Sequence, residues 1–211
     1  MKTSVHHDIP EVADRLAELG LSSVILRTAV MAGEAARSSS TPNDPPGFAG
    51  YIAWGQTIRA LREQLAPLGW QRNDEGNYST VTDEHGCVAI AVATGDENTG
   101  SVTASPKTKN PKGSATTAAI DANNQQLAFG FINAEPIAQQ SSSRVTWILL
   151  IARSEDDVRC ELSLPLATGD DARIDVWQKR IILDPVQLDP LPTITLDSGP
   201  EIEVEVRRRV G

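Results

Sequence analysis

The sequence has few aromatic residues and no long apolar run. Aromatic side chains make up 4% of its 211 residues, so the core must rest mainly on valine, isoleucine, leucine and alanine. The longest apolar runs, such as residues 147–152, are far too short to span a bilayer. The first residues show no apolar segment followed by a cleavage pattern, so we expect no signal peptide. These features predict a soluble, cytoplasmic protein that has no membrane partner.

Cysteine is also scarce. Cys87 and Cys160 make no disulfide framework, and two thiols alone make no zinc site. Both lie in segments that read as strands, where a cysteine usually acts as a small buried hydrophobe. We therefore expect a reduced protein and assign no metal ligand to either cysteine.

Sequence motifs of catalysis and of cofactor binding are missing. The chain contains no GxxxxGK[ST], GxGxxG, GxSxG or HExxH pattern. Its three histidines do not combine with other residues into a nucleophile, base and orienting acid. His6 and His7 stand near the amino terminus and are expected to be exposed and inert. The sequence therefore leans away from an enzyme and leaves any cofactor unassigned.

The sequence also has informative features, and the first of them is its charge. The chain is acidic, with a net charge of −9 and an isoelectric point near 4.8. Duplex phosphates would be repelled by such a surface, which argues against non-specific duplex binding by the whole protein. A local basic site remains compatible with this composition.

Helical patterns dominate the first third of the chain. A helical pair is predicted within 1–37, with Asp8 as the N-cap of its first helix. Residues 38–50 are rich in serine and proline and predict a loop. An amphipathic helix is predicted over 51–68, where apolar residues recur at helical spacing.

From residue 70 to 211 the pattern is typical of strands. A hairpin is expected around the turn "DEHG", and a second pair of strands around an acidic turn at 155–157. The alternating segment "EIEVEV" predicts a last hairpin before the arginines at 207–209. This order predicts an α+β fold in one domain, residues 1–211, with N-terminal helices packed on a mostly antiparallel β-sheet built from hairpins. A separate helical domain over 1–68 is the alternative.

Lysine is rare and clustered. Three of the five lysines, Lys107, Lys109 and Lys112, fall in a long connection over 95–117 that also holds two prolines. Gly113 and Ser114 follow, at the start of a segment that can form a helix, and exposed amides there would complement ammonium groups in binding a phosphate. A solvated, flexible excursion is the equally weighted alternative, since long loops are either functional or disordered.

The first hypothesis is a non-catalytic binding protein whose 95–117 loop engages an anionic partner, with nucleic acid or a nucleotide as the best candidates. A second is a metal-dependent enzyme acting on phosphodiesters or nucleotides, with Asp96 and Glu97 as metal ligands. The same two residues also suit an ordinary acidic turn, or ion pairs with Lys107 and Lys109 that fold the loop on itself. A third hypothesis is a protein–protein adaptor that uses its acidic surface or the edge of its last hairpin.

The tryptophans are predicted to be core residues. Each lies beside apolar neighbours, which favours packing over a role as a stacking platform for bases. They are Trp54, Trp70, Trp147 and Trp177.

Overall fold

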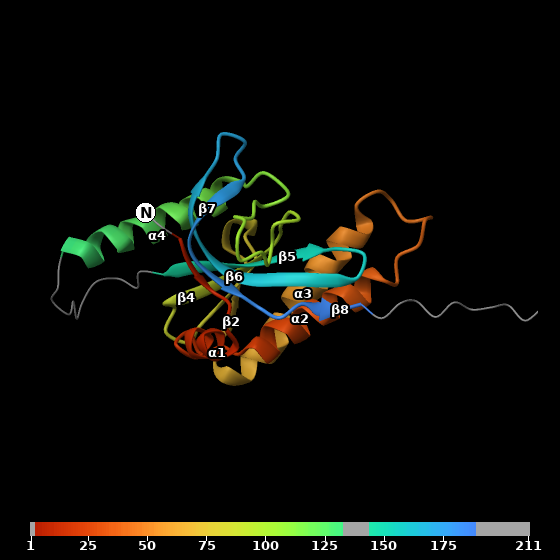
Figure 1. The fold of residues 1–211 in the computed structure, drawn as a ribbon, viewed down its shortest axis with the longest axis horizontal. Coiled ribbons are helices and arrows are strands. Elements are labelled where there is room, and N and C mark those ends of the chain that lie inside the picture. The colour runs from red at the N-terminus through yellow and green to blue at the C-terminus, as the bar shows by residue number, and fades with distance from the viewer. Residues whose placement is uncertain (1–2, 133–143, 189–211) are drawn as a thin grey trace, which may run out of the picture.

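The computed structural model of the protein describes residues 3–132 and 144–188. Four α-helices and an eight-stranded, mostly antiparallel sheet make up this part of the chain, which confirms the predicted α+β class. Figure 1 shows the sheet between two layers, with α1, α2 and α3 on one side and α4 on the other. The segment 95–113 lies on the same side as α4 (Figure 1).

The helices follow the sequence pattern closely. They are α1 (Ile9–Ala17), α2 (Ser23–Arg37), α3 (Phe48–Leu65) with a 3-10 turn at Ala66–Leu68, and α4 (Ser114–Ile132). Helix α3 begins three residues before the predicted boundary, so Phe48 to Gly50 are helical rather than part of the loop. The reason is Gly47, whose φ of +84° turns the chain directly into the helix.

The strands are β1 (Ser4–His6), β2 (Gln71–Asn73), β3 (Thr80–Thr82), β4 (Val88–Thr94), β5 (Val145–Arg153), β6 (Asp157–Thr168), β7 (Ile174–Ile182) and β8 (Val186–Gln187). Their order in the sheet is β1-β7-β6-β5-β4-β3-β2, and β8 pairs with the first residues of β6. The predicted hairpins β3–β4 and β5–β6 are present. Two pairs are parallel, β1–β7 and β4–β5, the latter because α4 carries the chain back between the strands.

One face of the sheet packs against α1, α2 and α3 through a large apolar cluster. Leu16, Leu26 and Leu61 of the helices meet Leu149 and Leu162 of the strands there, and all five are almost fully buried. The helices therefore share one hydrophobic core with the sheet. Burying their apolar stripes against strands is what stabilises such short helices.

Cys160 and Cys87 differ in their surroundings. Cys160 is fully buried in the apolar cluster, and burial raises the pKa of its thiol to about 12. Cys87 is exposed in the turn that precedes β4, so the expectation that both cysteines are buried in strands is wrong for this one.

The expectation that His6 is exposed is also wrong. It is buried in β1, and its Nδ1 lies 2.7 Å from the Oε1 of Glu11 on α1. The predicted last hairpin and the arginines at 207–209 lie outside the described residues. Within residues 3–132 and 144–188, no helix combines the length and the apolar character needed to cross a bilayer.

Candidate functional site

The lysine-bearing segment is fixed to the sheet by its backbone. The Thr108 N–H donates to the carbonyl of Ile174 on β7 (3.0 Å), and the Lys109 N–H donates to the carbonyl of Thr94 on β4 (2.8 Å). The Lys112 N–H donates to a carbonyl in the β6–β7 turn (2.8 Å). The segment thus bridges the end of β4 and the start of β7, and it is not a solvated excursion.

The front of the same connection is held by a buried ion pair on the sheet. The Arg180 guanidinium on β7 makes two bonds to the Glu161 carboxylate on β6, of 2.9 and 2.5 Å, and both side chains are almost fully buried. The guanidinium also donates to the carbonyls of Ser101 and Ala104. The Gly100 N–H donates to Glu161 (2.9 Å). Hydrogen bonds to this buried ion pair therefore attach the loop to the sheet.

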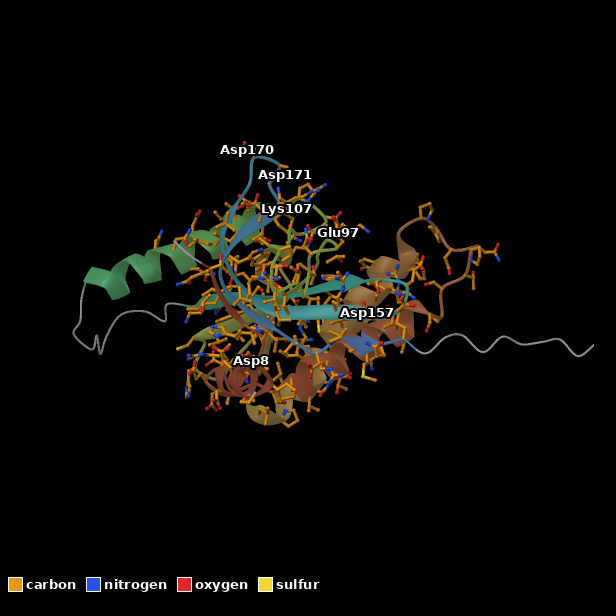
Figure 2. The ribbon with its side chains drawn as sticks, viewed as in Figure 1. Asp8, Glu97, Lys107, Asp157, Asp170 and Asp171 are labelled. Atoms are coloured by element: carbon orange, nitrogen blue, oxygen red, sulfur yellow. The ribbon has the colours of Figure 1, made fainter. Side chains whose placement is uncertain are left out.

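The three predicted lysines do not act as one group. The Nζ of Lys107 lies 3.2 Å from the carboxylate of Asp175 on β7. Figure 2 shows Lys107 and Glu97 on the side of the sheet opposite to Asp8, near the β6–β7 turn that carries Asp170 and Asp171. Lys107 therefore supports the attachment of the loop, whereas Lys109 and Lys112 line a cavity.

Gly113 and Ser114 lie at the point where the loop becomes a helix. Ser114 is the first residue of α4, so the loop ends earlier than the predicted boundary at 117. The carbonyl of Gly113 accepts hydrogen bonds from the amides of Thr116 and Thr117, 3.1 and 3.2 Å away. Neither Gly113 nor Ser114 lines the cavity that Lys112 borders.

A cavity of about 680 Å³ opens where two helices meet the ends of two parallel strands. Its walls come from α2, from the first half of α3, from the carboxyl ends of β4 and β5, and from the lysine segment. We call it the basic cavity, and its polar and aromatic lining consists of Glu34, Arg37, Tyr51, Trp54, Thr57, Thr94, Lys109, Asn110, Lys112 and Arg153. Crevices at the carboxyl ends of parallel strands are frequent ligand sites in sheets covered by helices.

The lining of the basic cavity is strongly cationic. It has four basic side chains, Arg37, Lys109, Lys112 and Arg153, and one acidic side chain, Glu34. Glu34 Oε1 accepts from Arg153 Nε at 2.6 Å, and within the described part of the chain the other three cations have no carboxylate partner. The whole chain has a net charge of −9, so the positive charge of this cavity is opposite in sign to that of the protein as a whole.

Lys112 is one of the cations that line the basic cavity. Its side chain is half-buried, and this burial lowers the pKa of the ammonium below its ordinary value because it removes water from the charge. A perturbed group inside a cleft is a candidate for ligand binding on physical grounds. An anion in the cavity would stabilise the charged ammonium of Lys112 in place of the water that burial removes.

Two aromatic residues at the cavity complete the site. The ring centroids of Tyr51 and Trp54 lie 5.8 Å apart with an interplanar angle of 35°. Trp54 Nε1 donates to the carbonyl of Val92 on β4 (3.2 Å), and Tyr51 is 70% exposed. The prediction that every tryptophan is core holds for the three buried ones and is wrong for Trp54, which lines the cavity.

Sequence reasoning missed Arg37, Tyr51, Trp54 and Arg153 as site residues. They come from segments far apart in the chain, and only the packing of α2 and α3 on the sheet unites them. A signal was present for α3, since Gly47, Gly50, Tyr51 and Trp54 recur at a spacing that places them on one helix face.

Comparisons with known proteins give no relative. No protein-family model, no curated protein sequence and no solved structure matches the chain. Any functional conclusion therefore rests on the chemistry of the residues themselves.

Asp96 and Glu97 lie in a tight turn after β4. Asp96 Oδ1 accepts from the Asn98 N–H (3.1 Å), and the Glu97 carbonyl accepts from Arg159 (2.9 Å). The loop folds back here through a backbone bond between the Asp96 N–H and the carbonyl of Lys107, not through side-chain ion pairs. In residues 3–132 and 144–188 no three histidine, cysteine or acidic side chains are grouped to hold a metal ion.

Proposed function

We propose that the protein is a non-catalytic cytoplasmic binding protein that holds a small phosphate-bearing ligand in the basic cavity. One observation carries the proposal: Arg37, Lys109 and Lys112 line a single cavity without carboxylate partners in the described chain. Like charges that line one cavity repel one another, and an anion bound between them would offset this repulsion. Charge-assisted hydrogen bonds to phosphate oxygens would supply that compensation.

The start of α3 adds backbone N–H donors to the basic cavity. Its N-cap is Gly47, which has no side chain to cap the helix, and Ala49 and Gly50 line the cavity. Amides in a first helical turn have no partner within the helix, and the helix dipole places partial positive charge there. The lysines and the helix start thus favour the same kind of ligand.

Of the two partners expected from the sequence, a nucleotide-sized ligand suits the site better than a nucleic acid polymer. A volume of about 680 Å³ falls within the range of small-molecule sites. A polymer would extend beyond the cavity, and the net charge of −9 of the whole chain disfavours additional phosphate contacts there.

The test compares two variants in calorimetric titrations and thermal unfolding. The first is Lys109→Gln with Lys112→Gln, which removes two cavity charges. The second is Lys107→Gln, a matched control from the same segment whose lysine is paired with Asp175. The probes are pyrophosphate, AMP and a single-stranded oligonucleotide. We expect AMP to raise the melting temperature of the wild type and of the control.

The double variant should bind AMP at least about tenfold more weakly than the wild type, since it lacks two charged donors. Equal loss in the control, or no binding of any phosphate probe to the wild type, would overturn the proposal. Preference for the oligonucleotide with a steep salt dependence would instead favour nucleic acid as the partner.

A further inference from the structure

We infer that the ligand of the basic cavity is a nucleoside phosphate whose planar base stacks on Tyr51 and Trp54. This inference rests on the proposed function, because it takes the phosphate to be held by Lys109 and Lys112. It adds a second subsite with a different chemistry, built by the first half of α3.

Of the two aromatic side chains, Trp54 is fixed by a hydrogen bond and Tyr51 is open to solvent. The hydrogen bond from Trp54 Nε1 to the Val92 carbonyl fixes the indole against β4. Tyr51, one turn earlier on the same helix face, is 70% exposed although its ring contacts the indole. A large ring held at a cavity with most of its surface in water is available to a ligand.

Both subsites belong to one cavity, so a single molecule can reach both. Tyr51 and Trp54 come from the helix wall, whereas Lys109 and Lys112 come from the lysine segment. A sugar phosphate or a free phosphate would use the cationic side chains and the amides at the start of α3, and would leave the rings in water. Base–aromatic stacking tolerates every base because each base has a π-face, so we infer the class and not a particular base.

The test measures how much a base adds to binding. AMP, ribose 5-phosphate, pyrophosphate and adenosine are titrated by calorimetry into the wild type and into Tyr51→Ala, Trp54→Phe and Phe48→Ala. Phe48→Ala is the matched control, because Phe48 is a partly exposed aromatic residue of the same helix that does not line the cavity. Tyr51 is exposed, and phenylalanine keeps an aromatic ring at position 54, so the variants should fold.

We expect the wild type to bind AMP about tenfold more tightly than ribose 5-phosphate, within the range of one base–aromatic stack. Tyr51→Ala should abolish most of this preference without changing pyrophosphate affinity, and Phe48→Ala should keep it. AMP should quench tryptophan fluorescence in the wild type and much less in Trp54→Phe.

The outcomes separate the two ideas. Equal affinities for AMP and ribose 5-phosphate, with loss of both in the lysine double variant, would overturn the stacking inference and leave the phosphate proposal standing. Binding of adenosine alone, or of none of the probes, would overturn both.

Discussion

The two faces of the sheet are covered by different kinds of contact. On the face under α1–α3, a cluster of twenty buried apolar residues joins the helices to the strands. On the face under α4 and segment 95–113, the side chains that the structure describes, which in α4 end at residue 125, form a cluster of six. The loop on that face is held instead by Arg180, Glu161 and backbone hydrogen bonds to β4 and β7.

This difference has a physical consequence for the site. Apolar packing depends on buried area and tolerates small shifts, whereas hydrogen bonds depend on distance and angle. A loop held by hydrogen bonds therefore has one well-defined path. Here that path brings the Lys109 and Lys112 side chains to a cavity that is also lined by α2, α3 and the ends of β4 and β5.

Breaking the buried ion pair should have the largest effect on stability. Arg180→Met leaves the Glu161 carboxylate buried without its cation, and the carbonyls of Ser101 and Ala104 lose a donor. We expect the free energy of unfolding to fall by about 3 to 5 kcal/mol, measured by urea denaturation. Glu161→Leu should cost a similar amount.

The double variant Arg180→Met, Glu161→Leu separates stability from positioning. Replacing both charges with apolar groups should restore much of the stability, since no unpaired charge stays buried. The loop would still lack its guanidinium donor, so hydrogen exchange at the amides of Lys109 and Lys112 should speed up and AMP affinity should fall. Additive losses of stability in the double variant would contradict the ion-pair account.

A cavity in the apolar face should cost less and should leave the loop in place. Leu26 of α2 is fully buried, and Leu26→Ala should lower the free energy of unfolding by about 3 kcal/mol. The control is Val24→Ala on the same helix, where the side chain is 70% exposed and little change is expected. Amide exchange in segment 107–112 should stay at the wild-type rate in both variants. Faster exchange there in Leu26→Ala would show that the two faces are not independent.

The predictability of the fold follows the same division. Helices α1–α3 and the hairpins β3–β4 and β5–β6 could be predicted because apolar periodicity and turn residues record them locally. The start of α3 at Phe48 could not, since a glycine at positive φ is compatible with a loop as well as with a helix start. The parallel pairing of β4 with β5 depends on the path of α4, which no short pattern encodes.

The site could be predicted only in part. Clustering in the sequence singled out Lys107, Lys109 and Lys112, and two of these three line the cavity. The ion pair of Lys107 with Asp175 was not predictable, because the two residues meet only when the loop lies on β7. Arg37 and Arg153 belong to α2 and β5. A single arginine in such an element is expected to be a solvent-exposed surface charge, so neither residue could be predicted to line a site.

The smallest predicted effect concerns Lys112, where the polar loop enters the basic cavity. Burial lowers the pKa of its ammonium from the ordinary value of 10.5, so at alkaline pH the unfolded chain binds more protons at this site than the folded one. The contribution of Lys112 to the free energy of unfolding should therefore rise with pH, from the lowered pKa of the folded state up to 10.5. The difference in unfolding free energy between wild type and Lys112→Met isolates the group, and it should increase over that interval. Saturating pyrophosphate should flatten the increase, because a bound anion stabilises the charged ammonium; a slope unchanged by pyrophosphate would place the anion away from Lys112.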